Sequence, residues 1–236
     1  MQIGLITICT GKYQKYIEDF VASANRNFLS NHNLVIFVFT DSVQEITRRD
    51  NVFLVPEQSK PWPFSTLDRF TCFCNAYRLF TGCDVLYFMD GDMYVDKPVG
   101  DEILPDANFK LVGVAHPGFY NQNTGSFERD RRSTSAVNPK HDITYHQGCL
   151  FGGFFKDFIK LCFACKKNID IDLSNNVIAS WHDESHMNHY FIYNERPKTL
   201  LSCYAYPQNC GHEKFGIPKD WKILHLAKDS AEMRAV

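Results

Sequence analysis

Along the first ninety residues, short apolar runs alternate with longer segments in which apolar residues recur at helical spacing. The apolar runs span 3–8, 34–39, 52–55 and 85–89, and their lengths are typical of buried strands. The segments 13–28 and 66–80 have the spacing of helices. Strands that alternate with helices predict an α/β protein with a mostly parallel sheet covered on both faces.

The second half of the chain has a less regular pattern. We expect strands over 111–115 and 222–226, an edge strand over 200–206, and helices over 154–167 and 183–193. Residues 121–142 are polar and charged without an apolar period, which is typical of a functional lid or binding loop. The 236 residues fit one large domain or two closely packed subdomains.

The apolar run 85–89 ends in two carboxylates that are separated by one glycine, Asp90-Gly91-Asp92. Side chains two residues apart in an extended chain point to the same side, so Asp90 and Asp92 should lie together. The carboxyl edge of a central strand is where open α/β sheets bind ligands, and carboxylate oxygens suit Mg²⁺ or Mn²⁺. The alternative is a strand-to-turn junction with two solvated aspartates, since Asp-Gly is common in turns.

A second polar cluster is the string Trp181-His-Asp-Glu-Ser-His186. A helix that begins near Asp183 would place His182 and His186 about one turn apart on one face. This spacing is close to the HExxH pattern of zinc peptidases, with Asp183 in the place of the glutamate. The sequence offers no convincing third zinc ligand downstream, and the alternative is a polar helix start with one core histidine.

Two further strings contain candidate binding residues. His116-Pro-Gly-Phe-Tyr120 combines a histidine and aromatic residues at a turn, which suits stacking on a sugar, although an ordinary strand exit has the same composition. The small residues in Gly148-Cys-Leu-Phe-Gly-Gly153 permit close approach of the backbone to a ligand. The spacing and the lysine of a P-loop are missing from that string.

Composition narrows the possible partners and the compartment. The net charge is −2 and no basic stripe stands out, which argues against nucleic acid as the main partner. The nine cysteines are scattered among apolar residues, which predicts reduced, buried thiols rather than disulfides or a zinc ribbon. We find neither a signal-peptide pattern nor an apolar stretch of membrane-spanning length, so we expect a cytoplasmic protein without a transmembrane anchor.

Taken together, the strings resemble family 6 glycosyltransferases, the retaining enzymes that include the ABO blood-group transferases and the α-1,3-galactosyltransferases. The matching strings are Phe88-Met-Asp-Gly-Asp92, His116-Pro-Gly-Phe-Tyr120, Arg131-Arg132, Phe151-Gly-Gly153 and Trp181-His-Asp-Glu-Ser-His186. The resemblance implies a GT-A fold in one domain over 1–236. It places a Rossmann-like nucleotide-binding half at about 1–95, and an acceptor-binding half with a closing C-terminal tail at 96–236.

The implied reaction is an α-1,3 transfer of galactose or N-acetylgalactosamine from UDP-Gal or UDP-GalNAc to a β-galactoside in an oligosaccharide or glycolipid. By resemblance, Asp90 and Asp92 hold Mn²⁺, or Mg²⁺, against the diphosphate. Glu184 falls on the catalytic glutamate, as a nucleophile or as a carboxylate that stabilises oxocarbenium-like charge. The other implied donor-site residues are Ile8, Thr10, Tyr13, Arg69, Gln147, Cys149, Asp183, Lys228 and Arg234, and the implied acceptor-site residues are His116, Trp181 and Glu128.

The chain departs from the family pattern at several positions. Gln147 and Cys149 occupy the two positions that sort galactose from N-acetylgalactosamine, and Cys149 is larger than the glycine associated with N-acetyl donors. Glu128 replaces a small hydroxyl residue and Ser133 replaces a proline, which bears on the acceptor. The anchor and stem of animal members are absent from the sequence, so we expect a soluble bacterial or viral member.

Two other functions remain open at this point. One is a zinc-dependent peptidase that uses His182 and His186. The other is a non-catalytic protein that binds a nucleotide sugar or a glycan.

Overall fold

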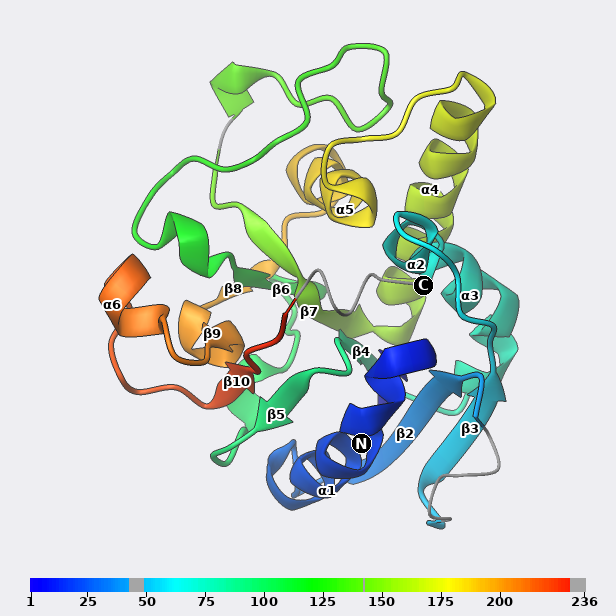
Figure 1. The fold of residues 1–236 in the computed structure, drawn as a ribbon, viewed down its shortest axis with the longest axis vertical. Coiled ribbons are helices and arrows are strands. Elements are labelled where there is room, and N and C mark those ends of the chain that lie inside the picture. Colours follow the sequence, from blue (N-terminus) through cyan, green and yellow to red (C-terminus); the bar gives the residue numbers. More distant parts are fainter. Residues whose placement is uncertain (43–48, 142, 230–236) are drawn as a thin grey trace.

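A seven-stranded sheet forms the centre of the computed structural model, which describes residues 1–42, 49–141 and 143–229 (Figure 1). The strand order is β3-β2-β1-β4-β7-β6-β8. The strands are β1 (Gln2–Ile8), β2 (Asn33–Thr40), β3 (Val52–Pro56), β4 (Val85–Met89), β6 (Leu111–Ala115), β7 (His146–Phe154) and β8 (Lys198–Leu200). Strand β7 is antiparallel to both of its neighbours, whereas the other pairings are parallel. The expected mostly parallel α/β sheet is therefore confirmed, and it agrees with the GT-A fold that the resemblance implies.

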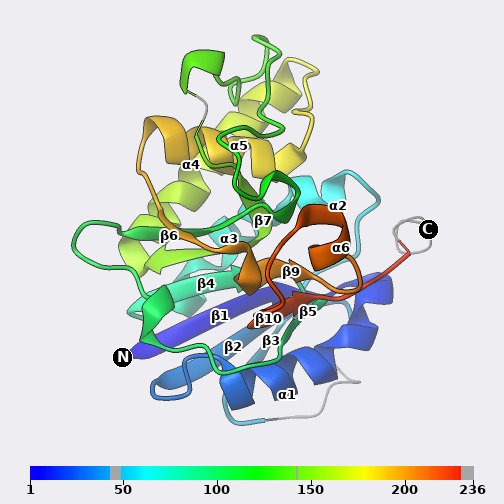
Figure 2. The same ribbon diagram turned by 90° about the vertical axis from the view of Figure 1, so that its left-hand side faces the viewer.

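Helices cover both faces of this sheet (Figure 2). Helix α1 (Ile17–Asn27) packs Phe20 against one face, together with Leu5 and Tyr87 of the strands. The opposite face, which includes Phe88 of β4, is covered by α3 (Arg69–Ala76), α4 (Phe155–Ser174) and α5 (His182–Tyr193). Because successive strand residues point to opposite faces, an all-apolar strand such as β4 contributes to both cores. None of the described helices is long and apolar enough to cross a membrane.

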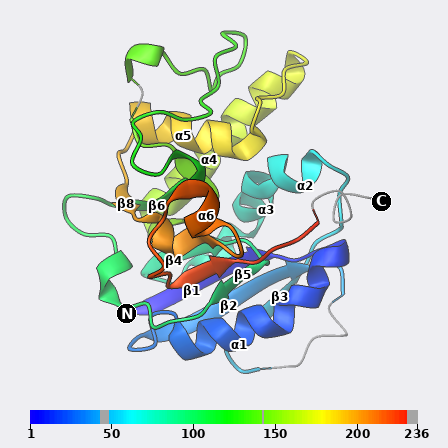
Figure 3. The ribbon, with the colours of Figure 1, turned by 60° about the vertical axis from the view of Figure 1, so that its left-hand side comes forward.

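A smaller sheet joins the C-terminal segment to the end of β4 (Figure 3). Its strands are β5 (Met93–Val95), β10 (Ile223–His225) and β9 (Tyr206–Pro207), with β10 in the middle. The predicted strand over 222–226 is confirmed by β10. The predicted edge strand over 200–206 is wrong, because a 3-10 helix (Ser202–Ala205) separates β8 from β9. All four residues of that 3-10 helix are buried, which an alternating edge strand cannot achieve.

The predicted helices are present with different boundaries. A 3-10 helix (Gly11–Tyr16) precedes α1, and the segment 66–80 contains the end of α2 (Phe64–Leu67), α3 and a 3-10 helix (Tyr77–Phe80). Helix α4 extends to Ser174, beyond the predicted end. Other short helices that were not predicted are α6 (Gly211–Phe215) and the 3-10 helices Asp101–Ile103, Pro117–Phe119 and Pro139–His141, and strand β5 was not predicted either.

The run 148–153, interpreted from the sequence as a site of close approach to a ligand, belongs to strand β7. A Cβ atom on Gly152 would lie 2.4 Å from the ring of Tyr87. The absence of a side chain at Gly152 therefore serves packing of β7 on β4, whereas Gly148 at the other end contacts the site described below. All nine cysteines are free thiols and eight of them are buried, which confirms that prediction.

Candidate active site

The carboxyl end of β4 carries Asp90 and Asp92 to the edge where the two sheets meet. All five residues of β4 are buried, and the Asp90 N–H donates to the Cys149 carbonyl of β7 at 2.9 Å. The turn passes so close to Cys9 that a Cβ atom on Gly91 would lie 2.1 Å from its sulfur. Backbone pairing and this tight turn fix both aspartates relative to the central sheet.

Asp92 is fully buried and lies beside Lys228 and His225. The Lys228 ammonium donates to Asp92 Oδ2, and His225 Nε2 lies 3.3 Å from the same oxygen. Burial alone raises the pKa of Asp92, but His225 and Lys228 outweigh burial and hold it well below its usual range. The other oxygen, Oδ1, has no hydrogen-bond partner among the described residues.

Three side chains at this edge could hold a metal ion. Ligand atoms of Asp90, Asp92 and His225 all lie within 4.8 Å of one another. The unpartnered, buried Oδ1 of Asp92 fits the requirement of a cation ligand, because a buried polar atom without a partner is costly. Two carboxylates and an imidazole are donors that Mn²⁺ accepts. Sequence reasoning missed His225, which lies inside the predicted strand 222–226 and is the last residue of β10 in the structure.

Arg69 of α3 links this edge to the start of α5. Its guanidinium lies 3.1 Å from Asp90 Oδ1 and 2.8 Å from Asp183 Oδ2, and it donates to the Gly148 carbonyl at 2.7 Å. It also lies 4.2 Å from the centre of the Phe88 ring. Burial lowers the pKa of Arg69, but Asp183 and Asp90 outweigh burial and raise it. The buried arginine is therefore a fixed positive charge between two carboxylates.

Glu184 in the first turn of α5 is held by donors to both of its oxygens. Tyr145 OH donates to Oε1 and the Gly148 N–H donates to Oε2, each at 2.7 Å. Burial raises the pKa of Glu184 to about 7 and that of the adjacent Asp183 to about 6. The residue before this pair, His182, has a φ of 50°, a conformation that L-residues rarely adopt and that occurs often at functional sites. Sequence reasoning missed Tyr145, which gave no motif of its own.

The two histidines of the peptidase-like spacing contact different helices. His182 Nδ1 lies 3.0 Å from Thr66 Oγ1 of α2, whereas the buried His186 has Nε2 3.7 Å from Asp172 Oδ2 of α4. They do not belong to the metal-capable cluster that the described residues form. This arrangement of His182 and His186 therefore does not support the zinc-peptidase alternative, which needs both histidines to bind one zinc ion.

Of the residues predicted to bind the acceptor, His116 contacts Tyr145 and Trp181 directly precedes α5. The His116 ring packs against that of Tyr145, and its Nδ1 accepts from the Gly118 N–H at 3.0 Å. Burial, together with the nearby charge of His225, lowers the pKa of His116 to about 4, so this imidazole is neutral at neutral pH. The Trp181 side chain is 53% exposed, which leaves an apolar face available beside α5.

The Glu128 carboxylate accepts hydrogen bonds from three backbone N–H groups. Its Oε1 accepts from the N–H groups of Arg129 and Asp130 at 2.7 Å each, and its Oε2 accepts from the Ser180 N–H at 2.6 Å. The carboxylate therefore ties the long polar loop to the segment that leads into α5. A contact between Glu128 and the acceptor stays a prediction.

Most of the predicted donor-side residues surround the aspartate pair. Ile8, Thr10 and Arg69 line one narrow hollow. Tyr13 OH accepts from the Lys228 ammonium at 3.0 Å. Cys149 is buried, and Gln147 Nε2 lies 3.5 Å from His225 Nδ1. Arg234 lies outside the described residues.

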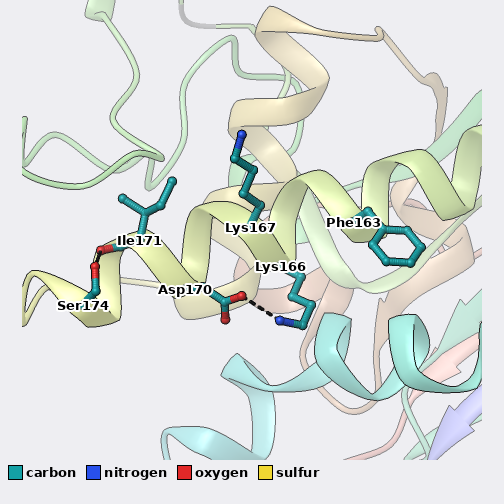
Figure 4. A pocket seen from close by; sticks show the side chains of 6 residues that line it. All are labelled: Phe163, Lys166, Lys167, Asp170, Ile171 and Ser174. Atoms are coloured by element: carbon teal, nitrogen blue, oxygen red, sulfur yellow. Dashed lines mark hydrogen bonds and ion pairs between the residues drawn. The ribbon is translucent and has the colours of Figure 1, made fainter.

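A wider hollow of about 420 Å³ follows the outer surface of α4, away from these residues (Figure 4). Its lining is Phe163, Lys166, Lys167, Asp170, Ile171 and Ser174. Lys166 and Asp170 form an ion pair there at 2.6 Å. Because it holds none of the predicted site residues, we place the chemistry at the sheet edge.

Comparison with known proteins agrees with this geometry. The family model described as glycosyltransferase family 6 matches residues 1–236. The O-antigen biosynthesis glycosyltransferase WbnI of Escherichia coli is 30% identical over 97% of this chain and 96% of its own length. The histo-blood group ABO system transferase 2 of Rattus norvegicus is 31% identical over 87% of this chain and 64% of its own.

The globoside alpha-1,3-N-acetylgalactosaminyltransferase 1 of Homo sapiens is 30% identical over 100% of this chain and 69% of its own. The chain thus spans nearly the full length of the bacterial relative and about two thirds of these two animal ones. With a family match that covers every residue and relatives at this level of identity, the chain belongs to glycosyltransferase family 6 and is a glycosyltransferase.

Proposed function

We propose that the protein is a retaining α-1,3-glycosyltransferase that moves galactose or N-acetylgalactosamine from a UDP-sugar to a β-galactoside, with Mn²⁺ as cofactor. The observation that carries the proposal is the buried Glu184 carboxylate, held by Tyr145 OH and the Gly148 N–H. Arg69 connects this carboxylate's helix to Asp90. A group suited to a reacting sugar carbon therefore lies next to a group suited to a nucleoside diphosphate.

At the diphosphate end, Asp90 and Asp92 would hold the cation. A bound Mn²⁺ would neutralise the charge that develops on the departing UDP. Lys228 supplies a second positive charge at this end, and its ammonium already contacts both Asp92 and Tyr13. The positive charge of such a lysine complements the negative charge of a diphosphate oxygen.

At the sugar end, Glu184 would face the anomeric carbon. Transfer with retention develops positive charge on the sugar ring as its bond to the UDP oxygen breaks. As UDP leaves, the carboxylate of Glu184 either bonds to that carbon until the acceptor hydroxyl oxygen displaces it, or stabilises the charge without bonding. In both cases the hydroxyl proton would pass to an oxygen of the departing UDP. Asp183, paired with Arg69, lies one residue away and would orient sugar hydroxyls.

The acceptor would lie between Trp181 and His116. An exposed indole gives a galactose ring an apolar face, and a neutral imidazole can donate or accept one hydrogen bond. The name of one relative includes an alpha-1,3 linkage and N-acetylgalactosamine, and that of another an alpha-1,3 galactosyl transfer. Cys149 fills space that a glycine would leave open, which favours galactose over the bulkier N-acetylgalactosamine.

The test is release of UDP from a panel of UDP-sugars in the presence of Mn²⁺, with and without β-galactoside acceptors. We expect release from UDP-Gal or UDP-GalNAc, and faster release when the acceptor is present. A variant of the surface pair on α4, Asp170→Asn, should match the wild type. Failure to turn over any UDP-sugar would contradict the proposal, and calorimetric binding without turnover would instead indicate a sugar-nucleotide binder.

A further inference from the structure

Strand β10 brings a histidine from the C-terminal segment to the aspartate edge. In the antiparallel register of β5 and β10, His225 is the partner of Met93, the residue directly after Asp92. The Leu226 N–H donates to the Asp92 carbonyl at 2.9 Å. Backbone pairing therefore holds His225 beside Asp92, with Nε2 3.3 Å from Asp92 Oδ2. Figures 1 and 3 show the ribbon of β10 next to that of β5.

The same edge has a buried oxygen that needs a positive partner. Asp92 is fully buried, and its Oδ1 has no hydrogen-bond partner in the described part of the chain. Its other oxygen contacts the Lys228 ammonium and His225. A buried carboxylate with one unpartnered oxygen and two neighbouring ligand atoms has the features of a cation site.

We infer that His225 is the third protein ligand of the divalent cation and that Gln147 is the residue that positions its imidazole. This inference rests on the proposed metal-assisted sugar transfer. Ligand atoms of Asp90, Asp92 and His225 lie within 4.8 Å of one another, close enough to converge on one ion after small side-chain movements. Two carboxylates from the β4–β5 turn and one imidazole from β10 would then bind the ion from two segments distant in sequence.

Gln147 of β7 can set which nitrogen of His225 carries the proton. Its Nε2 lies 3.5 Å from His225 Nδ1, and its Oε1 is buried without a partner among the described residues. Rotation of the amide would turn Oε1 toward Nδ1 and let that oxygen accept the Nδ1 proton. His225 Nε2 would then present its lone pair to the ion, which is the usual arrangement of a metal-bound histidine.

An imidazole ligand also affects which metal the site selects. Carboxylates accept Mg²⁺ and Mn²⁺, whereas imidazole nitrogen is a ligand of transition metals. His225 should therefore make the site prefer Mn²⁺ over Mg²⁺. Replacing it with a third carboxylate, His225→Asp, should narrow that preference.

The direct test is electron spin echo spectroscopy of the full chain with Mn²⁺ and UDP, which detects ¹⁴N bound to the ion. We expect nitrogen coupling in the wild type and none in His225→Gln, which should also bind Mn²⁺ about tenfold more weakly or worse in calorimetry. The matched control is His32→Gln. It removes another histidine beside an aspartate, with His32 Nε2 2.9 Å from Asp101 Oδ1, and it should keep the coupling.

A wild-type protein that binds Mn²⁺ without nitrogen coupling would overturn the ligand role, even if the enzyme transfers sugar. Nitrogen coupling in a protein that turns over no UDP-sugar would support the ligand role while contradicting the proposed function. For Gln147, the Gln147→Ala change should weaken Mn²⁺ binding in the wild type but add nothing in His225→Gln. Equal losses in both backgrounds would overturn the positioning role.

Discussion

Glu184 is fixed by two hydrogen bonds that come from different parts of the chain, Tyr145 in the segment before β7 and Gly148 within β7. Burial raises its pKa to about 7, and both hydrogen bonds act in the opposite direction. A carboxylate that faces positive charge must be ionised. The kcat/KM of the free enzyme should therefore rise as the pH increases through about 7.

The Tyr145→Phe change tests this assignment. Loss of the hydroxyl removes a donor that lowers the Glu184 pKa, so the acid limb of the kcat/KM profile should move to higher pH. Loss of a hydrogen bond to a charged group costs about 1.5 kcal/mol, which corresponds to roughly tenfold in rate near neutral pH. A pH–rate series is the measurement, with Tyr77→Phe at the surface as the control. An unmoved acid limb would show that Tyr145 does not tune Glu184.

Individual site residues could be predicted only where a short sequence pattern or the family resemblance indicated them. Asp90 and Asp92 follow directly from the end of an apolar strand, whereas the role expected of Glu184 came from the family resemblance and not from the polar string alone. Tyr145 and His225 depend on partners that are 39 and 133 residues away in sequence. A short-range pattern contains nothing about such pairings.

At the scale of elements, the packing of β7 on β4 depends on Gly152. A Cβ atom there would lie 2.4 Å from the Tyr87 ring and 2.6 Å from the Leu86 carbonyl. We expect Gly152→Ala to destabilise the protein by about 2 kcal/mol, visible as a midpoint shift in urea unfolding. At Gly82 a Cβ atom meets no described atom within 4 Å, so Gly82→Ala should stay within about 0.5 kcal/mol of the wild type. Equal effects of the two changes would contradict this packing.

The segment after β10 brings the Lys228 ammonium into contact with Asp92, so on the proposed function it would compete with the metal ion for that carboxylate. Lys228→Met removes that positive charge. We expect about tenfold tighter Mn²⁺ binding without nucleotide, and about tenfold weaker UDP binding, because a charged hydrogen bond is lost. Calorimetry measures both, with Lys166→Met on α4 as the control. If Mn²⁺ affinity falls instead, Lys228 does not compete for the site.

The strands β1, β2, β4 and β6 were predictable because each is mostly apolar along its length. Strand β7 was not predicted, because its small residues were interpreted as permitting close approach to a ligand rather than close packing on Tyr87. The segment 200–206 was apolar enough for a strand, but its residues are buried in succession and form a 3-10 helix. Burial of consecutive residues is a tertiary property, and local pattern cannot distinguish it from alternation.

At the scale of the whole molecule, the candidate site lies where the seven-stranded sheet meets the three-stranded sheet. The order of the matching strings was enough to predict the GT-A fold. The smaller sheet was not predictable as a unit, because its strands contain only two or three residues each. In this sheet β10 pairs with β5, and the pairing places His225 next to Asp92.

The measurement that tests the central proposal most directly is proton NMR of the purified product of UDP-Gal or UDP-GalNAc, Mn²⁺ and a β-galactoside acceptor. A Glu184 carboxylate facing the sugar carbon predicts that the new bond keeps the α configuration of the donor, and the proposed α-1,3 transfer predicts that this bond joins O3 of the acceptor galactose. A β-linked product, or attachment at another hydroxyl, would contradict the account.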